Sequence, residues 1–395
     1  ALILQMKQPW SKKHKQDFQG RAYSLSNSFA NPLSHAELVQ LTQARNDTAL
    51  LNEYNNHSLE YTPNGGSLDL RLEISKLYGP KIGPENILVF AGGQVAIQTA
   101  AQAFARNCHS IVFSPGYQST VESPEWSRES LGCTQIRRRA NNRWQIDIEE
   151  VRAAIQPNTK YMVINEPYNP GGIVMAQSLQ KELVELCDKH GIVILCDEVY
   201  RLLEHDEKDR IPAMADAYHR GISCVTMSKP WGACGVTIGW LACQDSEMLQ
   251  QLWDCQYFGT ACVSRASEIQ AVMVLRASDV ILKDRIEIIR HNKALLQDVI
   301  ENQYPDLFEW QRPNAGAIAF VKFKGPLTSL ELGDVLARRG ISIKPAYCFA
   351  AQVTPDIDYF RVGFGERKMP LALAEFVKVI EEHKNVWRET MQKGN

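Results

Sequence analysis

The sequence has little net charge and no long apolar run near its start. Its 43 lysine and arginine residues almost balance its 45 aspartate and glutamate residues, which leaves a formal charge of -2. Such a chain lacks the strong field that gathers nucleic acid or an anionic membrane surface. Residues 1–4 are apolar but lysines soon follow, so this run is too short for a signal peptide or a membrane span. We therefore expect a cytoplasmic protein that binds small molecules.

The sequence also lacks paired cysteines, internal repeats and low-complexity segments. Its 10 cysteines form no Cys-x-x-Cys pair and no His/Cys spacing typical of a metal site. Several of them, such as Cys196 and Cys224, lie in apolar runs typical of buried strands. We expect free thiols that serve as small hydrophobic side chains, and no metal.

What the chain does have is a regular alternation of short apolar runs and amphipathic segments. With 395 residues, 45% of them hydrophobic, it can bury a large core in two or three packed regions. Strands that are apolar throughout and alternate with helices indicate an α/β fold with a mostly parallel sheet covered on both faces. The expected strands are 87–90, 111–113, 161–164, 192–195 and 224–227, and one expected helix is 177–190.

Three parts of the chain are expected. Residues 1–50 form an N-terminal arm with a helix at 34–45, where Ser34 and Glu37 make a capping box. Residues 51–300 form the large region, which ends in helices over 246–302 broken around 260–264. Residues 301–395 form a smaller α+β domain that packs with the arm. Its expected strands are 317–323 and 359–365, and its expected helices are 327–339 and 370–387.

Polar motifs follow the apolar runs, at the strand ends where open α/β sheets bind ligands. Gly92-Gly93-Gln94 opens a helix, where free backbone N–H groups favour a phosphate. The others are Tyr117, the run 169–172 (Asn-Pro-Gly-Gly), Asp197 with Tyr200, and Ser228-Lys229. Each alone most often marks a turn, a loop or a solvated charge. Their joint position predicts one site.

The order and spacing of these motifs resemble the fold-type-I enzymes dependent on pyridoxal phosphate, the aspartate aminotransferase superfamily, from about residue 61 to residue 361. The matching motifs are Asn-Pro-x-Gly at 169–172, Asp-x-x-Tyr at 197–200 and Ser-Lys at 228–229 with Gly235 downstream. The resemblance implies an enzyme that holds pyridoxal 5'-phosphate and acts at the α-carbon of an amino acid. It also implies a homodimer with shared active sites.

The resemblance assigns a role to each matching residue. Lys229 would hold the cofactor as a Schiff base, Asp197 would pair with the pyridine nitrogen, Asn169 and Tyr200 would contact the ring hydroxyl oxygen, and Tyr117 would stack on the ring. Gly93, Gln94, Thr226 and Ser228 would hold the phosphate, Tyr61 would reach the phosphate of a neighbouring subunit, and Arg361, with Asn169, would bind the substrate carboxylate.

Elementary chemistry supports these roles. A carboxylate such as Asp197 keeps a pyridine nitrogen protonated, which lets the ring store electrons. A cationic cofactor lowers the pKa of Lys229, so that its amine can carry a proton at the α-carbon. The Arg361 guanidinium matches a carboxylate bidentately. Arg361 could instead be an ordinary surface arginine, but its apolar flanks favour a buried charge that needs a partner.

One position departs from the superfamily pattern. Common members have an arginine eight residues after the lysine, where this chain has Thr237. The loss of a charge-assisted contact with phosphate costs roughly 1.5–3 kcal/mol unless another cation replaces it. We expect either weaker cofactor retention or a substitute Arg or Lys elsewhere.

The arm suggests a subgroup. Residues 23–30 and 32–38, the run 115–119 and the pair Lys229-Pro230 resemble capreomycidine synthase and related enzymes, which cyclise hydroxylated arginine to a cyclic guanidine of the enduracididine or capreomycidine type without net amino transfer. Ser28 of this segment is a predicted substrate contact. Asp17, Glu122 and Glu125 are candidates to bind a guanidinium, although solvated charge is the common role of such residues.

Three functions therefore stand at this point. A hydroxyarginine cyclase leads, and a conventional aminotransferase that moves the amino group to a 2-oxo acid comes second. A non-enzymatic sensor on the same fold is the third, because a fold alone does not fix function. The presence of both Lys229 and Asp197 disfavours the sensor.

Overall fold

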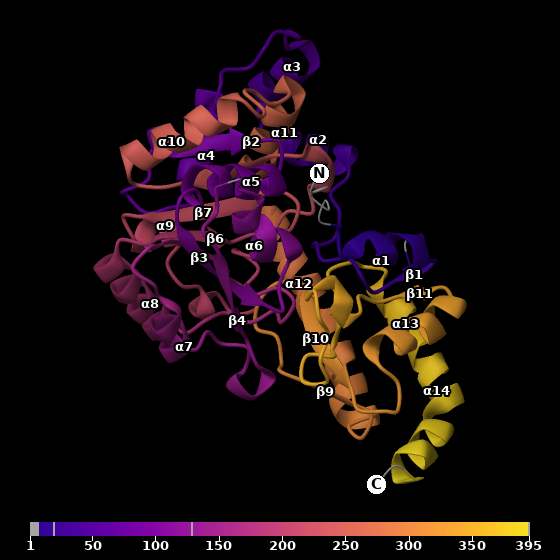
Figure 1. The fold of residues 1–395 in the computed structure, drawn as a ribbon. Helices are drawn as coiled ribbons and strands as arrows, with labels where there is room; N and C mark the ends of the chain where they lie inside the picture. Colours follow the sequence, from indigo (N-terminus) through magenta and orange to yellow (C-terminus); the bar gives the residue numbers. More distant parts are fainter. Residues whose placement is uncertain (1–7, 19, 128, 394–395) are drawn as a thin grey trace, which may run out of the picture.

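A seven-stranded sheet runs through the larger part of the molecule, in the order β2-β8-β7-β6-β5-β3-β4 (Figure 1). The structure is a computed structural model that describes residues 8–18, 20–127 and 129–393. Strands β7, β6, β5, β3 and β4 are mutually parallel, and β8 is antiparallel to β2 and β7. This confirms the predicted α/β class with a mostly parallel sheet. The strands are β2 (Ile87–Phe90), β3 (His109–Ser114), β4 (Cys133–Arg137), β5 (Thr159–Asn165), β6 (Val193–Asp197), β7 (Gly221–Thr226) and β8 (Gly239–Ala242).

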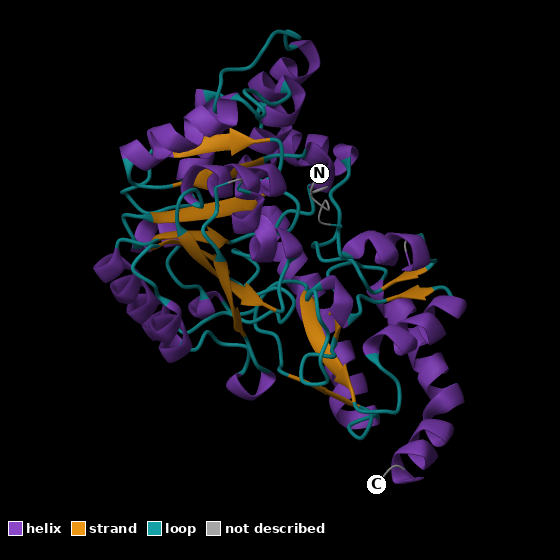
Figure 2. Ribbon diagram, viewed as in Figure 1, coloured by secondary structure: helices purple, strands orange, loops and turns teal. Residues whose placement is uncertain are grey.

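The central strands are largely apolar because helices cover both faces of the sheet (Figure 2), whereas the edge strand β4 has exposed and partly exposed residues. In β5, Tyr161 and Val163 belong to the cluster with α5 (Gly93–Phe104) and α10 (Ser246–Tyr257). Met162 and Ile164, which alternate with them, belong to the cluster on the other face with α7 (Ile148–Ala154) and α8 (Gln177–His190). Successive side chains of the strand thus point alternately into the two hydrophobic clusters on opposite faces of the sheet.

A third cluster closes the β2 end of the sheet. Helix α2 (His35–Ala44) begins at Ser34, whose side chain accepts from the Glu37 N–H, so the predicted capping box is confirmed. With it pack α3 (Thr48–Asn56), α4 (Leu68–Ser75) and α11 (Arg265–Arg276). The predicted break before α11 is present. Helix α12 (Ser278–Gln297), with a π-helical turn (Asp298–Gln303), then leads to the smaller region.

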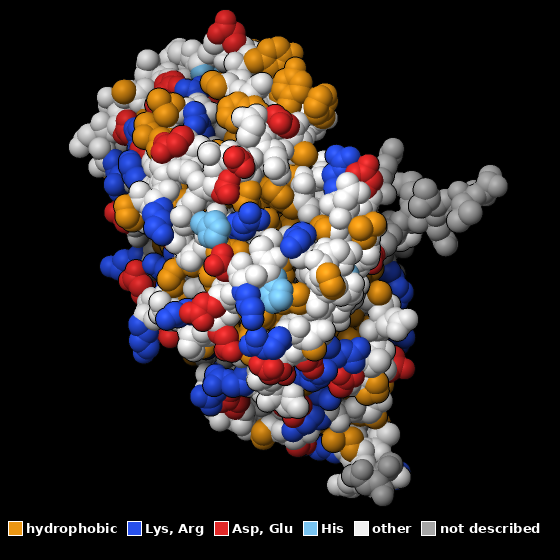
Figure 3. Space-filling model, turned by 60° about the vertical axis from the view of Figure 1, so that its left-hand side comes forward, with side chains coloured by type: hydrophobic (Ala, Val, Ile, Leu, Met, Phe, Trp, Pro, Cys, Tyr) orange, Lys and Arg blue, Asp and Glu red, His pale blue; other side chains and the backbone are white. Residues whose placement is uncertain are grey.

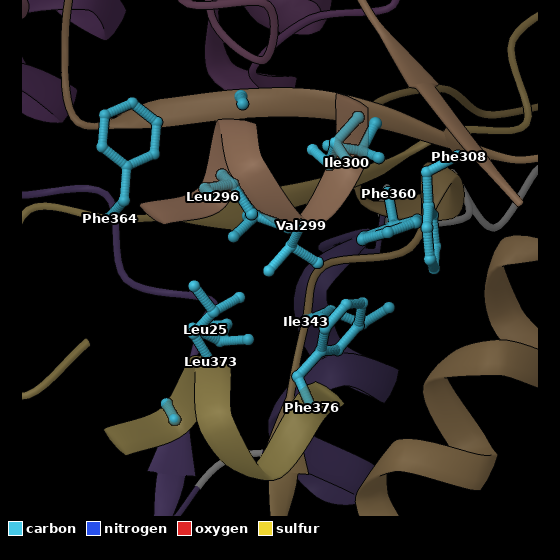
Figure 4. Packing of buried hydrophobic residues seen from close by; sticks show 14 of the residues in the cluster. Leu25, Leu296, Val299, Ile300, Phe308, Ile343, Phe360, Phe364, Leu373 and Phe376 are labelled. Carbon is cyan, nitrogen blue, oxygen red and sulfur yellow. The ribbon is translucent and has the colours of Figure 1, made fainter. Parts of the chain in front are cut away.

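The smaller region holds an antiparallel sheet of order β12-β10-β9. Its elements are β9 (Phe308–Trp310), β10 (Ile318–Phe323), β12 (Phe360–Gly363), α13 (Ser329–Arg338) and α14 (Met369–Lys393). Its core contains Leu25 of the N-terminal arm together with Ile343 and Phe360, and Figure 4 shows Leu25 beside Leu373 of α14. Strand β1 (Tyr23–Ser24) pairs in parallel with β11 (Ile341–Ser342), so residues far apart in sequence complete one layer.

Short elements finish the chain: α1 (Ser11–Phe18), α6 (Gln118–Glu122), α9 (Met214–Ala217) and the 3-10 turns Pro84–Asn86, Ser123–Trp126, Ala140–Asn142, Glu207–Asp209, Cys234–Val236 and Ala346–Cys348. Among the described residues, none of the helices combines the length and the apolar character that crossing a bilayer requires.

Candidate active site

The carboxyl ends of β5, β6 and β7 bring the predicted residues together with one strand of the smaller region. Strand β6 ends at Asp197, and Lys229 lies close enough for its charge to act on that carboxyl. Strand β12 presents Arg361, whose Nη1 donates to Asn169 Oδ1 at 3.0 Å. The site therefore lies between the two regions of the molecule.

Lys229 is half-buried, and its Nζ donates to Ser28 Oγ at 3.0 Å. Loss of contact with water, together with the charge of Arg361, lowers the pKa of Lys229 to about 8. The buried Asp197 behaves in the opposite sense, because burial outweighs a hydrogen bond from the Val199 N–H and raises its pKa to about 7. Both groups can therefore change protonation near neutral pH.

Several buried side-chain donors have no hydrogen-bond partner among the described residues, and two of them belong to the predicted site. These two are the Tyr200 hydroxyl and Arg361 Nε. Buried polar groups are usually satisfied, so these two donors have the capacity to meet an acceptor on a bound group. The ring hydroxyl oxygen of pyridoxal phosphate and a substrate carboxylate are acceptors of that kind. The residues present therefore fit the cofactor.

The start of α5 forms a cradle for an anion. Gly92 has φ +97° and precedes the helix, but it has no side chain to cap it. The first backbone N–H groups of the helix, at Gly93 and Gln94, are therefore available to an anion. A Cβ on Gly93 would lie 3.5 Å from Thr226 Cβ, and Thr226 Oγ1 lies 3.2 Å from Ser228 Oγ. These predicted phosphate residues share one place.

Thr237 stands beside this cradle. It adopts the left-handed conformation, with φ +56°, and a Cβ on Gly92 would lie 4.0 Å from its Cγ2. The position of the family arginine thus borders the predicted phosphate residues, but it offers a hydroxyl in place of a charge.

The other two predicted tyrosines, Tyr117 and Tyr61, differ in position. Tyr117 precedes α6, and its hydroxyl donates to Gln94 Oε1 at 3.2 Å, which places it over the cradle. Tyr61 is 95% exposed and faces away from its own chain. This exposure is compatible with a role in a second subunit.

A cavity of about 280 Å³ lies beside Lys229. Its described walls come from the arm, from β11 and from β12: Ser11, His14, Gly20, Arg21, Ser24, Ser26, Asn27, Ser28, Phe29, Lys229, Ser342, Lys344 and Arg361. Four of these side chains are lysines or arginines. The described part of the cavity is therefore cationic.

The guanidinium candidates do not line this cavity among the described side chains. Glu122 is buried and accepts from Gln118 Nε2 at 2.7 Å, while Glu125 is exposed. The backbone of Asp17 lies in α1, but its side chain is outside the described part of the chain. The structure thus brings neither glutamate to Lys229.

Sequence reasoning missed the backbone of the arm as a site element. Arg361 Nη2 donates to the Ser26 carbonyl at 2.9 Å, and Asn27 Nδ2 donates to Glu366 Oε2 at 2.7 Å. The serine-rich composition hinted that this segment matters. It could not show which carbonyl meets Arg361, because that depends on the tertiary path.

A family model described as aminotransferase class I and II matches residues 26–375. The chain belongs to this family. As a member of it, the chain is a pyridoxal-phosphate enzyme. It is similar to a probable aspartate aminotransferase of Methanocaldococcus jannaschii, with 25% identity over 299 residues, which cover 73% of this chain and 77% of the relative. The predictions of the superfamily, of an enzyme and of the cofactor are thereby confirmed.

Two further similarities bear on this class I and II enzyme. A capreomycidine synthase of Streptomyces vinaceus is 25% identical over 256 residues, which cover 64% of this chain and 63% of the relative. A solved pyridoxal-phosphate-dependent aminotransferase from Streptococcus suis matches with a TM-score of 0.86 at 25% identity, over 96% of this chain and 99% of the other. The fold is therefore that of the fold-type-I enzymes.

Proposed function

We propose that this enzyme cyclises a hydroxylated arginine to a cyclic guanidino amino acid. The observation that carries the proposal is the contact between Ser28 and Lys229. Through it, the arm segment that resembles the capreomycidine synthase group forms a wall of the active site. The similarity to a capreomycidine synthase supports the same function.

The residues that would hold the cofactor are those that the sequence predicted. Bound pyridoxal phosphate supplies an electron sink for bonds broken at the substrate α-carbon. Asp197 would lie at its ring nitrogen, Tyr200 and Asn169 at its ring oxygen, and Tyr117 at its ring face. The start of α5, with Thr226 and Ser228, would bind its phosphate.

The substrate would be oriented by its carboxylate and deprotonated by Lys229. The Arg361 guanidinium is buried and held by Asn169 and by the Ser26 carbonyl, so it is fixed before the substrate arrives. The Lys229 amine, whose pKa is about 8, can take and return a proton at the α-carbon near neutral pH.

Cyclisation balances without an oxidant. The bond between a side-chain carbon and its hydroxyl breaks, a guanidine nitrogen bonds to the side chain and loses a proton, and that proton and the hydroxyl leave as water. The amino group stays on the product. The chain therefore needs a proton carrier and a shielded cavity, but no second substrate.

A conventional aminotransferase is the second candidate, and one observation favours it. The described cavity walls carry Arg21, Lys344 and Arg361, which suit an acidic amino acid or a dicarboxylic 2-oxo acid better than a guanidinium. The similarity to a probable aspartate aminotransferase points the same way.

One experiment separates the two. The purified holoenzyme is given 4-hydroxyarginine labelled with nitrogen-15 in its α-amino group, alone and with 2-oxoglutarate, and the products are weighed by mass spectrometry. We expect a product lighter by one water that keeps the label, at a rate independent of 2-oxoglutarate. Label found in glutamate, with no dehydrated product, would establish an aminotransferase. The same assay with aspartate tests the acidic substrate.

We also propose a homodimer with shared sites. Three large apolar side chains are almost fully exposed on the large region: Leu59, Tyr61 and Phe258, at 94%, 95% and 90%. Figure 3 shows hydrophobic side chains gathered at the end of the molecule that carries α3. Apolar surface of this kind is typical of a protein interface. A second copy packed there would receive Tyr61.

A further inference from the structure

The arm reaches Lys229 along a path fixed by backbone contacts. The Ala30 N–H donates to the Lys229 carbonyl at 3.0 Å, and the Gly363 N–H donates to the Leu25 carbonyl at 2.7 Å. Residues 25–30 are therefore tied at one end to strand β12 and at the other to the residue that holds the cofactor. Ser28 lies between these two anchors.

Three glycines make room for this path. A Cβ on Gly363 would collide with the Asn27 carbonyl, one on Gly365 with the Phe29 carbonyl, and one on Gly232 with the Asn31 carbonyl. Each collision is with backbone, which cannot rotate away as a flexible side chain can. The arm is thus seated against its neighbours on both sides of Ser28, and the Ser28 hydroxyl has little freedom to leave Lys229.

The charged and polar groups around Lys229 have opposing effects on the charge of its amine. Arg361 on β12 opposes a charge on its amine, whereas Asp197 on β6 and Cys234 in the turn after Lys229 favour it. The Phe29 ring lies 6.0 Å from Nζ, at the outer limit for a cation–π contact. Among the described side chains, Ser28 Oγ is the only hydrogen-bond acceptor that the structure gives to Nζ.

We propose that Ser28 is a positioning residue, which accepts a hydrogen bond from the Lys229 amine and thereby fixes where that amine takes and returns its proton. A neutral amine that removes the α-proton becomes an ammonium with three N–H donors, and an acceptor held at 3.0 Å stabilises and aims this ion. The proposal deepens the proposed function, on which it rests, because both candidate reactions need this proton carrier.

The test measures the pKa of Lys229 without any amino acid. Cofactor-free protein is labelled with a trace of acetic anhydride at a series of pH values, and acetylation of the Lys229 peptide is quantified by mass. Because Ser28 Oγ stabilises the charged form, Ser28→Ala should lower the pKa of Lys229 by about one unit. Ser28→Cys keeps the size but offers a weaker acceptor, so it should give a smaller decrease. Ser75→Ala, on α4, is the matched control and should give none.

An unchanged or increased pKa in both Ser28 variants would overturn the proposal. The holoenzyme supplies a second readout, the exchange of the arginine α-hydrogen in D2O. Ser28→Ala should slow this exchange about 10-fold at neutral pH and shift its pH profile to lower pH, with Ser28→Thr restoring it. If the wild type forms no product from any amino acid while the labelling shift is present, the proposed function fails and the role of Ser28 stands. If the wild type forms the cyclic product but the labelling shift is absent, the proposed function stands and the role of Ser28 fails.

Discussion

At the scale of single residues, the site holds two ionisable groups that burial drives toward neutrality. The pKa of Asp197 is raised to about 7, chiefly by burial, and that of Lys229 is lowered to about 8. For Asp197 the folded-state pKa lies above its ordinary value of 3.8. Between pH 3.8 and about pH 7 the folded protein keeps a proton on Asp197 that the unfolded chain has released. Folding stability therefore falls as pH rises through this window.

This sign leads to a prediction about Asp197→Asn in the cofactor-free protein. At pH 8 the variant removes a buried carboxylate, so its thermal midpoint should exceed that of the wild type by about 2–4 °C. At pH 4, near the ordinary pKa of 3.8, the wild-type carboxyl is neutral in the folded state and keeps much of its proton in the unfolded chain, so the difference should nearly vanish. Thermal scans of the two proteins at both pH values measure it. Asp254→Asn, at an exposed carboxylate, should show no such pH dependence.

At the scale of elements, strand β8 and the start of α5 determine the anion cradle together. A Cβ on Gly239 would lie 2.7 Å from the Gly93 nitrogen, closer than real Cβ atoms come. Only a glycine at this point of β8 lets α5 begin where its N–H groups face the site. The cradle therefore depends on a residue outside the predicted phosphate motif.

Gly239→Ala should accordingly displace the start of α5 and weaken cofactor binding. Loss of one charge-assisted hydrogen bond to phosphate corresponds to about a 10- to 100-fold rise in the dissociation constant. Equilibrium dialysis against pyridoxal phosphate measures it. Gly235→Ala, in the 3-10 turn before β8, is the control, because its Cβ would meet nothing within 4 Å. Equal affinity in both variants would refute the role given to Gly239.

The elements themselves were largely predictable. Five parallel or antiparallel strands coincide with apolar runs because both faces of the sheet are buried, and α2 begins at its capping box because that signal is local. Strands β4 and β8 were not predicted. Exposed or partly exposed residues interrupt β4, so its pattern is weak.

The site was predictable to the extent that motifs follow strands. Asp197 and Lys229 follow apolar runs, and parallel strands bring their carboxyl ends to one edge. The contacts of the arm with Lys229 could not be predicted from the sequence. Whether Ser28 meets Lys229 depends on three glycine clearances in distant segments, which no local pattern encodes. The missing phosphate charge at Thr237 was visible in the sequence, but its replacement, if any, was not.

At the scale of the whole molecule, the exposed Tyr61 makes the proposed dimer testable. If Tyr61 serves the site of the second copy, each site takes Lys229 from one subunit and Tyr61 from the other. When one subunit carries Tyr61→Ala and its partner carries Lys229→Ala, both changes fall at the same site. A mixed dimer then contains one intact site and one doubly damaged site. The mixed dimer, isolated through two different tags, should therefore have about half of the wild-type activity at limiting cofactor.

The measurement compares each variant alone with co-expressed, doubly tagged dimers. Tyr61→Ala alone should need about 10-fold more cofactor, and Lys229→Ala alone should be inactive. Leu371→Ala, at another exposed apolar residue, is the control for Tyr61. Absence of recovery in the mixed dimer would show that Tyr61 acts within its own chain or not at all.

The pairing of β1 with β11 has a consequence for how the protein is made. Tyr23 is translated long before its partner Ile341. At the usual 5–20 residues per second, the ribosome needs roughly 15–60 seconds to span the gap. Throughout this time the arm carries Ser28 without the strand that receives it. The nascent chain can thus build its central sheet early, but Lys229 gains a fixed Ser28 as its neighbour only when synthesis is nearly complete.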